Sequence, residues 1–242
     1  MSSAQPLSAS APLLAVRDLE GWYGESHVLH GIEFDVAPGE VVTLLGRNGA
    51  GKTTTLKAIM GILAKRKGSV QFEGRELIGA PSRAIAKAGI ALCPEERAIF
   101  SSLSVDENLM LPPVVKPGGM ALDTIFEMFP NLKERLNSQG TKLSGGEQQM
   151  LAIARILRTG AKMLLLDEPT EGLAPVIVQQ IGRTISRLKS EGYTIVLVEQ
   201  NFHFAASVAD HHYVVEQGRV IDMIPNAELG ANTEKLHAYL GV

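Results

Sequence analysis

Residues 46–53 read Gly-Arg-Asn-Gly-Ala-Gly-Lys-Thr and match the spacing G-x-x-x-x-G-K-[ST] at every fixed position. The preceding run from Val41 to Leu45 is apolar and rich in β-branched residues, which predicts a buried strand. From Thr54 to Ile62 the apolar residues recur at helical spacing. Strand, glycine-rich loop and helix in this order are the context that a phosphate-binding loop requires. A glycine-rich turn that merely closes a helix is the alternative, and this context disfavours it.

The chemistry of phosphates gives each residue of this loop a role. Glycines let the backbone turn tightly, so that consecutive N–H groups point inward and, with the positive helix end, hold a polyphosphate. We expect Lys52 to reach the β- and γ-phosphates and Thr53 to hold Mg²⁺. The loop alone does not separate kinases, GTPases and ATPases. The residues expected to contact the nucleotide are Gly46, Arg47, Asn48, Gly49, Ala50, Gly51, Lys52, Thr53 and Thr54.

An aromatic residue upstream of the loop is a candidate for stacking on the base. Leu13 to Leu19, Val28 to Val36 and Val41 to Leu45 read as strands separated by turn residues. Two such strands can fold back and bring Tyr23 to an adenine ring. A tyrosine beside a glycine is also common in ordinary turns.

Carboxylates follow two buried strands, where α/β sheets gather their ligands. The run from Lys162 to Leu166 ends in Asp167 and Glu168, and two adjacent carboxylates are costly unless positive charge lies nearby. We expect Asp167 to hold Mg²⁺ and Glu168 to orient and deprotonate an attacking water. Successive strand residues point to opposite sides, so one carboxylate can face the metal and the other the water, unless the end of the strand distorts this alternation. Glu95, after a strand from Gly89 to Cys93, can approach the metal through water or be a solvated loop residue.

A second glycine pair opens a later helix, in the run Leu143 to Gln149. Paired glycines at a helix start make a second anion site, and a serine there can cap the helix or donate its hydroxyl to a phosphate. A simple N-cap explains the serine and one glycine, but explains the rest of the run less well. The residues of this candidate site are Ser144, Gly145, Gly146 and Glu147.

The remaining pattern predicts one α/β domain with an insertion. Helical periodicity and loop residues dominate 104–140, which indicates a helical lobe between two parts of a nucleotide-binding core. We expect a disordered segment 1–12, a core of residues 13–95 and 160–242, and a helical subdomain of about 96–159. Helices are expected over Ser82 to Ala88, Ala174 to Leu188 and Ala231 to Leu240.

The composition and charge of the chain disfavour several classes of function. A net charge of -3, with Lys and Arg scattered along the chain, does not favour binding to a nucleic-acid backbone. The longest apolar runs are far shorter than the roughly 20 residues that span a bilayer. Cys93 is the single cysteine, so an internal disulfide and a cysteine-built metal site are excluded, and a small buried hydrophobe is the simpler interpretation.

The strings GRNGAGKT, LSGGEQQ and LLLDEP occur in this order, with a helical lobe ahead of the second. Over nearly its full length the chain therefore resembles the ATP-binding subunits of ABC transporters, whereas kinases and GTPases lack the second string. The strings PEERAIF, TEGLAP and VEQN look like the branched-chain amino-acid importer branch. The resemblance implies the ABC ATPase fold of the P-loop NTPases, with a mostly parallel core sheet, an antiparallel β subdomain and an inserted helical subdomain.

The same resemblance implies partners and a mechanism. ATP held by Tyr23 and the phosphate-binding loop of one subunit would be covered by Ser144 to Glu147 of a second ABC ATPase subunit, in a homo- or heterodimer. Closure would drive two permease subunits in the membrane and, indirectly, an extracytoplasmic solute-binding protein. The groove beside Glu95 to Leu111 would receive a permease helix, and the chain would lie on the cytoplasmic face of the inner membrane. No nucleic-acid partner is expected.

Two positions depart from the family pattern. Glu95 stands where much of the family has Gln, and Gln200 stands where it has His. A glutamine can hydrogen-bond a γ-phosphate but cannot take up a proton near neutral pH, so hydrolysis can be slow or can depend on Glu168 alone. His203 is an alternative to the missing histidine. Two other functions remain open: a non-transport ABC ATPase, as an assembly scaffold or in nucleic-acid maintenance, and a nucleotide-binding regulator without hydrolysis.

Overall fold

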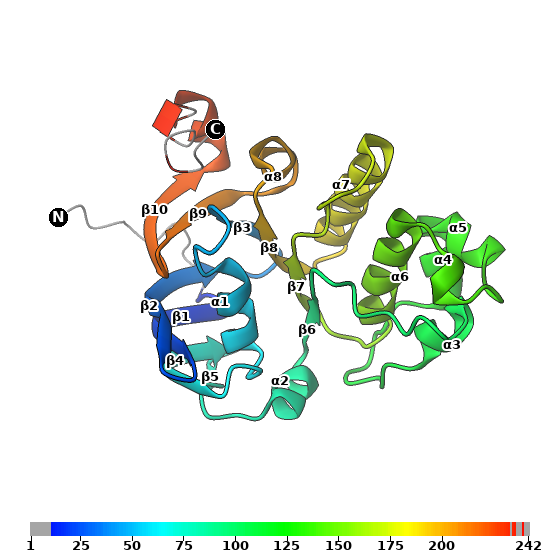
Figure 1. Cartoon of the computed structure of the whole chain (residues 1–242), viewed down its shortest axis with the longest axis horizontal. Helices are drawn as coiled ribbons and strands as arrows, with labels where there is room; N and C mark the ends of the chain where they lie inside the picture. Colours follow the sequence, from blue (N-terminus) through cyan, green and yellow to red (C-terminus); the bar gives the residue numbers. More distant parts are fainter. Residues whose placement is uncertain (1–10, 233, 236–238, 240–242) are drawn as a thin grey trace.

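A computed structural model describes residues 11–232, 234, 235 and 239. Two sheets and a group of helices make up the fold (Figure 1). The strands are β1 (Leu14–Tyr23), β2 (Ser26–Val36), β3 (Val41–Leu45), β4 (Lys65–Phe72), β5 (Arg75–Glu76), β6 (Ile90–Cys93), β7 (Met163–Asp167), β8 (Thr194–Glu199), β9 (His211–Glu216) and β10 (Arg219–Pro225). The α-helices are α1 (Lys52–Ile59), α2 (Ser82–Ala88), α3 (Val105–Met110), α4 (Leu122–Met128), α5 (Pro130–Glu134), α6 (Gly145–Leu157), α7 (Pro175–Ser190) and α8 (Phe202–Val208). Two 3-10 helices, η1 (Gly140–Lys142) and η2 (Asn226–Asn232), complete the described elements.

The larger sheet has the order β10-β9-β3-β8-β7-β6. Its neighbours are parallel from β9 to β6, and only the edge strand β10 is antiparallel. The smaller sheet, in the order β2-β1-β4-β5, is antiparallel throughout. The expected α/β fold with a mostly parallel core sheet and an antiparallel β part is therefore confirmed.

Side-chain alternation along the central strands divides the core in two. On β7, Leu164 and Leu166 pack in one hydrophobic cluster, whereas Met163 and Leu165 pack in another on the opposite face. Strand β8 alternates in the same way. This is the pattern of strands buried on both faces, because successive residues of a strand point to opposite sides. One face packs against α1 and the smaller sheet, and the other against α6 and α7.

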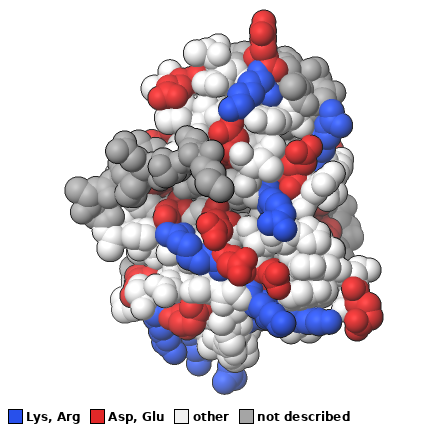
Figure 2. All heavy atoms as spheres, turned by 90° about the vertical axis from the view of Figure 1, so that its left-hand side faces the viewer, with Lys and Arg blue, Asp and Glu red and all other residues white. Residues whose placement is uncertain are grey.

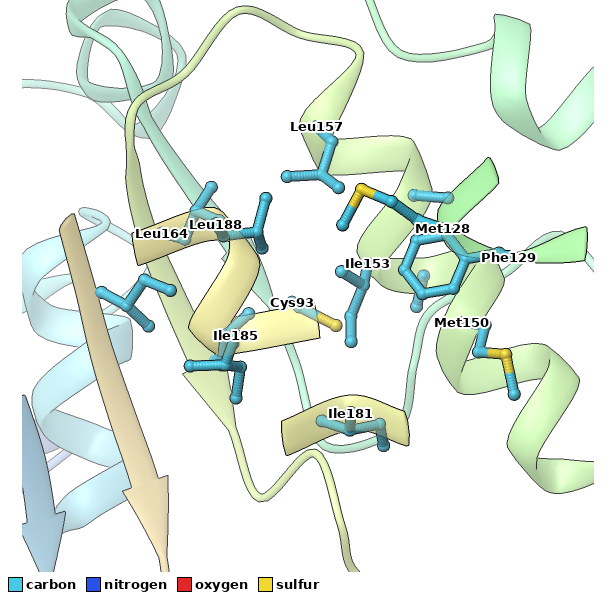
Figure 3. Packing of buried hydrophobic residues seen from close by; sticks show 14 of the residues in the cluster. Cys93, Met128, Phe129, Met150, Ile153, Leu157, Leu164, Ile181, Ile185 and Leu188 are labelled. Atoms are coloured by element: carbon cyan, nitrogen blue, oxygen red, sulfur yellow. The ribbon is translucent and has the colours of Figure 1, made fainter. Parts of the chain in front are cut away.

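Cys93 lies in the cluster on the helical side. Figure 3 shows it among side chains from α6 and α7, including Ile153 and Ile185. It is buried, and burial raises the pKa of its thiol to about 12. The expectation of a small buried hydrophobe is confirmed.

Helices α3 to α6 lie together on the right of Figure 1, away from the smaller sheet. Helices α3 and α6 start with a serine N-cap and a reciprocal glutamate, Ser104 with Glu107 and Ser144 with Glu147. These helices fall within the stretch expected to form a helical insertion. The domain boundaries near residues 95 and 160 remain a prediction.

Several expected elements have the bounds predicted, and others differ. The helix Ser82–Ala88 and the strand Val41–Leu45 agree in full. Helix α8 was not expected, because its sequence shows no clear helical period. Of the closing helix expected over Ala231 to Leu240, Glu234, Lys235 and Tyr239 are helical and Ala231 belongs to η2, while positions 233, 236–238 and 240 lie outside the described residues, as does most of the segment 1–12.

Candidate functional site

Loops at the carboxyl ends of β3, β7 and β8 meet in one pocket of about 370 Å³. This location follows from parallel pairing, which places the carboxyl ends of the strands at one edge of the sheet. The pocket is lined by Val28, Asn48, Gly49, Gly51, Lys52, Thr53, Thr54, Glu95, Glu168, Glu171 and Gln200. Residues from the glycine-rich loop and from three distant loops, after β6, β7 and β8, therefore line the same space.

The loop presents an uncapped helix start to this pocket. Gly51, at the N-cap of α1, has φ of 107°, a left-handed conformation that favours glycine. No side chain caps α1, and its first turn carries no acidic residue. The free N–H groups and the positive end of the helix dipole form an anion site. The backbone thus fits a phosphate, as the motif predicts.

Lys52 is buried and its ammonium is fully engaged. Its Nζ donates to the carbonyl oxygens of Gly46 and Arg47, at 2.8 Å and 3.1 Å. The same atom lies 3.4 Å from Glu168 Oε1, and both side chains are less than 10% exposed. A buried pair of this kind needs good geometry and further hydrogen bonds to be stable. Lys52 is thereby held beside the phosphate site, where its positive charge can also pair with a phosphate.

Thr53 and Asp167 form the candidate metal site. The Thr53 hydroxyl donates to Asp167 Oδ1 at 2.9 Å. Burial raises the pKa of Asp167 to about 6, the Thr53 bond opposes this rise, and the charges of Glu168 and Glu95 add to it. Within the described residues, no three His, Cys, Asp or Glu side chains form a metal site. This donor set fits Mg²⁺, which is usually held by one or two carboxylates together with phosphates and water.

Glu168 has an unusual backbone. Its φ is 44°, a left-handed conformation that costs a non-glycine residue on the order of 1 kcal/mol and persists only when neighbours hold it. With this turn, Glu168 reaches Lys52 while Asp167 reaches Thr53, so both carboxylates contact the first turn of α1. Strand β7 ends at Asp167, so Glu168 with its left-handed backbone lies beyond the regular strand, and simple alternation does not describe how the two carboxylates point.

Gln200 lies next to Glu168. Its Nε2 donates to Glu168 Oε2 at 2.6 Å, and both residues line the pocket. Glu168 thus has a cation on one oxygen and an amide donor on the other. An amide in this position can orient a carboxylate, a water or a phosphate, but it cannot accept a proton near neutral pH.

The remaining candidate site residues are not all found in this pocket. Glu95 is exposed but lines the pocket. Tyr23 ends β1, is 48% exposed and does not line the pocket. His203 lines a different hollow, between α7 and α8, so the structure does not support it as a substitute for the histidine that Gln200 replaces.

Residues 144–147 do not line this pocket within the same chain. The Ser144 oxygen accepts from Glu147 N at 3.3 Å, and Ser144 N donates to Glu147 Oε2 at 2.7 Å. A Cβ on Gly146 would lie 2.9 Å from Ile177, so this glycine permits the close approach of α6 to α7. The Ser144 hydroxyl is exposed but not free of partners: burial raises the pKa of Glu147, and hydrogen bonds from the backbone and hydroxyl of Ser144 outweigh that effect and lower it.

Sequence reasoning missed one buried polar pair beside the pocket. Thr170 Oγ1 donates to Glu199 Oε1 at 2.8 Å, and both residues are buried. Burial raises the pKa of Glu199 to about 7, against the opposing effect of the Thr170 hydrogen bond. Glu199 directly precedes Gln200, and a carboxylate at the end of an apolar strand was the signal that could have revealed the pair.

A parallel strand, a phosphate-binding loop and a helix, with acidic residues on the neighbouring strands, define a nucleotide-binding P-loop domain. The ABC transporter family model matches residues 29–171. The chain belongs to the ABC transporter family.

The curated relatives are ATP-binding subunits. The chain is 44% identical to the high-affinity branched-chain amino acid transport ATP-binding protein BraG of Pseudomonas aeruginosa, covering 95% of this chain and 100% of that protein. It is 35% identical to the probable branched-chain amino acid transport ATP-binding protein LivF of Archaeoglobus fulgidus, over 86% of this chain and 90% of that protein. It is 32% identical to the lipopolysaccharide export system ATP-binding protein LptB of Escherichia coli, over 94% and 97%.

Solved structures share the fold. An ATP-binding subunit of an ABC transporter superposes with a TM-score of 0.81 at 27% identity, covering 95% of this chain and 100% of that one. The ADP conformation of MJ1267, an ATP-binding cassette of an ABC transporter, gives a TM-score of 0.80 at 25% identity, over 96% and 100%. The expected ABC ATPase fold is confirmed.

The raised pKa of Glu199 predicts a pH-dependent stability. A carboxyl that binds its proton more tightly in the folded state stabilises the fold below its unfolded pKa, and this contribution is lost as pH rises to about 7. We expect wild type to lose on the order of 2 kcal/mol relative to Glu199→Gln between about pH 4.5 and pH 7.5. Urea unfolding of both proteins across this range measures the difference. Glu96→Gln, at an exposed position, is the control, and a pH-independent difference would contradict the prediction.

Proposed function

We propose that this chain is the ATP-binding and ATP-hydrolysing subunit of an ABC importer that takes up branched-chain amino acids. The observation that carries the ATPase function is the pocket in which Lys52, Glu168 and Gln200 meet. The solute class is inferred from relatives: identity is 44% and 35% to two branched-chain amino acid transport subunits, against 32% to a lipopolysaccharide export subunit.

Hydrolysis at this site follows from the contacts of Lys52. An arriving γ-phosphate competes with Glu168 for the ammonium, and Gln200 then holds a carboxylate that no longer pairs with a cation. Glu168 in that state is the group that orients and deprotonates the attacking water. Thr53 and Asp167, with Glu95 through water, would hold Mg²⁺, which supplies positive charge to the phosphates. Tyr23 provides an open aromatic face for the adenine.

A second ATPase subunit completes the site. Ser144 to Glu147 are absent from the pocket of their own chain, and the exposed Ser144 hydroxyl lies at the positive end of the 13-residue helix α6. In a head-to-tail dimer these groups of one subunit cover the γ-phosphate held by the other. ATP then stabilises the closed dimer, and hydrolysis removes that stabilisation.

The groove for a permease helix lies beside the loop after β6. A hollow of about 190 Å³ there is lined by Leu92, Arg97, Pro112 and Arg155, among others. Phe100, Met110, Leu111 and Val114 are large apolar residues that remain exposed in the same stretch of chain. Exposed apolar groups near a polar-rimmed hollow are typical of protein–protein contacts. Two permease subunits are the proposed partners, with an extracytoplasmic solute-binding protein acting indirectly.

The subunit is proposed to lie peripherally on the cytoplasmic face of the inner membrane. None of the described helices combines the length and the apolar character needed to span a bilayer. Figure 2 shows Lys, Arg, Asp and Glu interspersed on the face seen at the left of Figure 1, without a continuous basic stripe. A role in nucleic-acid maintenance gains no support from this face.

Lys52→Ala tests the phosphate cradle. Loss of the ammonium removes the cation that contacts the phosphates and leaves Glu168 unpaired, so affinity for ATP should fall by at least about tenfold. Isothermal titration of the purified chain with ATP measures this affinity. Lys87→Ala, at an exposed position on α2, should bind ATP as wild type does. Unchanged affinity in Lys52→Ala would refute the assignment.

Glu168→Gln tests the catalytic base. The amide keeps the shape of the side chain but cannot accept a proton, so hydrolysis should fall by about 10²-fold or more while ATP binding persists. The variant should also accumulate as a dimer in ATP. Steady-state phosphate release and size-exclusion chromatography measure the two effects, with Glu96→Gln as the control. Full turnover by Glu168→Gln would show that another group is the base.

Purification from membranes tests the transport function. The tagged full-length chain should bring down permease subunits, and a second, related ATPase if the dimer is a heterodimer. Cells that lack the chain should lose uptake of labelled leucine, isoleucine and valine, and the wild-type gene should restore it. Recovery of soluble partners alone, with uptake intact, would contradict an importer subunit.

A further inference from the structure

We propose that Thr170 and Glu199 are positioning residues, whose hydrogen bond holds Glu168 and Gln200 at the ends of β7 and β8 in the arrangement needed for hydrolysis. This inference rests on the proposed ATPase function. Neither residue lines the nucleotide pocket, so both act on hydrolysis through the groups that they hold in place and not by contact with the nucleotide.

The bond lies just beyond the end of the sheet ladder. Strands β7 and β8 pair as far as Asp167 and Val198, and Glu168 N extends the ladder with a bond to Val198 O at 3.0 Å. Beyond this point the segment after β7 leaves the sheet, whereas β8 continues to Glu199, which pairs with Leu45 of β3. The hydrogen bond from Thr170 Oγ1 to Glu199 Oε1, at 2.8 Å, joins the loop after β7 to the end of β8 once the ladder between these strands has ended.

The two polar pairs lie on different sides of this edge. Glu168 and Gln200 line the nucleotide pocket, whereas Thr170 and Glu199 line the hollow of about 980 Å³ between α7 and α8. Glu199 is the last residue of β8 and Gln200 directly follows it, so adjacent side chains at this strand end line the two different hollows. The pair of Glu168 and Gln200 therefore faces the nucleotide pocket. The pair of Thr170 and Glu199 joins the same two chain segments on the side of the other hollow.

The strained backbone of Glu168 explains why a further hydrogen bond is needed at the end of β7. Its left-handed conformation, with φ of 44°, persists only if the surrounding chain holds it. The bond from Glu168 N to Val198 O holds it on one side, and Glu171 N donates back to Glu168 O at 3.2 Å on the other. Thr170 lies inside that second turn, so its bond to Glu199 fixes the turn to β8.

Glu199 also fixes the chain around Gln200. Its Oε2 accepts from Asn201 N at 3.4 Å, and the Asn201 side chain caps α8 by accepting from Phe204 N at 3.1 Å. Gln200 is thus held between a strand end and a capped helix start. The carboxylate therefore contacts both loops that carry the reacting groups.

Burial favours a specific role for this carboxylate over simple packing. Glu199 is only 3% exposed and the charge of Glu168 opposes its own. A buried carboxylate without an opposite charge is costly, and an apolar residue would suit the end of the apolar strand β8 at lower cost. Holding the two loops together gives this residue a function that an apolar side chain cannot perform.

Thr170→Val removes the hydroxyl while keeping the side-chain shape, and Thr170→Ser keeps the hydroxyl. If the bond positions Glu168, kcat for ATP hydrolysis by the full chain should fall about tenfold or more in Thr170→Val, with ATP affinity and KM within about twofold of wild type. Thr170→Ser should retain at least about half of the wild-type kcat. Thr184→Val, at a buried threonine on α7, is the matched control and should hydrolyse ATP at the wild-type rate.

Amide hydrogen exchange gives a second readout that does not depend on activity. In Thr170→Val, the amides of Glu168 and Glu171 should exchange at least about tenfold faster than in wild type or Thr170→Ser, because the turn loses its side-chain bond to β8. Amides in the middle of β7 should keep their wild-type rates. Failure of wild type to hydrolyse ATP would refute the proposed function, and the exchange rates would then decide the positioning role by themselves.

Three results would overturn the inference. One is a wild-type kcat and wild-type exchange in Thr170→Val. Another is an equal loss of kcat in Thr170→Ser, since the hydroxyl would then not be the cause. The last is a parallel fall of ATP affinity and kcat with faster exchange throughout β7, which is the pattern of a general loss of structure.

Discussion

The buried ion pair between Lys52 and Glu168 is the interaction on which the proposed function depends. It joins the first turn of α1 to the end of β7, although β8 lies between β3 and β7 in the sheet. This strand order also brings Gln200, directly after β8, to the same pair. A parallel sheet buried on both faces holds these ends rigidly, because its two hydrophobic clusters fix each strand from opposite sides. An arriving nucleotide can then act by replacing Glu168 as the partner of the Lys52 ammonium.

The parts of this site that the sequence predicts are those set by local chemistry. The strand before the loop, Lys52 at the helix start, and Asp167 with Glu168 after an apolar strand can all be identified from short motifs. Their convergence was expected from the rule that ligands collect at the carboxyl ends of parallel strands. The capping boxes at Ser104 and Ser144 are equally local, and the structure contains both.

Features that depend on distant neighbours could not be predicted in the same way. The hydrogen bond between Thr170 and Glu199 joins a loop to a strand end that is remote in sequence, and each residue alone resembles an ordinary loop or strand end. The left-handed backbone of Glu168 distorts the end of β7, and short motifs do not encode that backbone angle. Helix α8 forms against α7 and the sheet, so tertiary packing and the Asn201 cap define it more than its own periodicity does.

Separation of the Ser144 turn from the pocket of its own chain leads to the central claim, that a sister subunit caps the nucleotide. An experimental structure of the ATP-bound, hydrolysis-blocked dimer tests this claim most directly. The account predicts the γ-phosphate between Lys52 of one subunit and Ser144 of the facing subunit, with the Ser144 oxygen about 3 Å from a phosphate oxygen. A nucleotide-loaded assembly in which Ser144 lies far from that phosphate would contradict it.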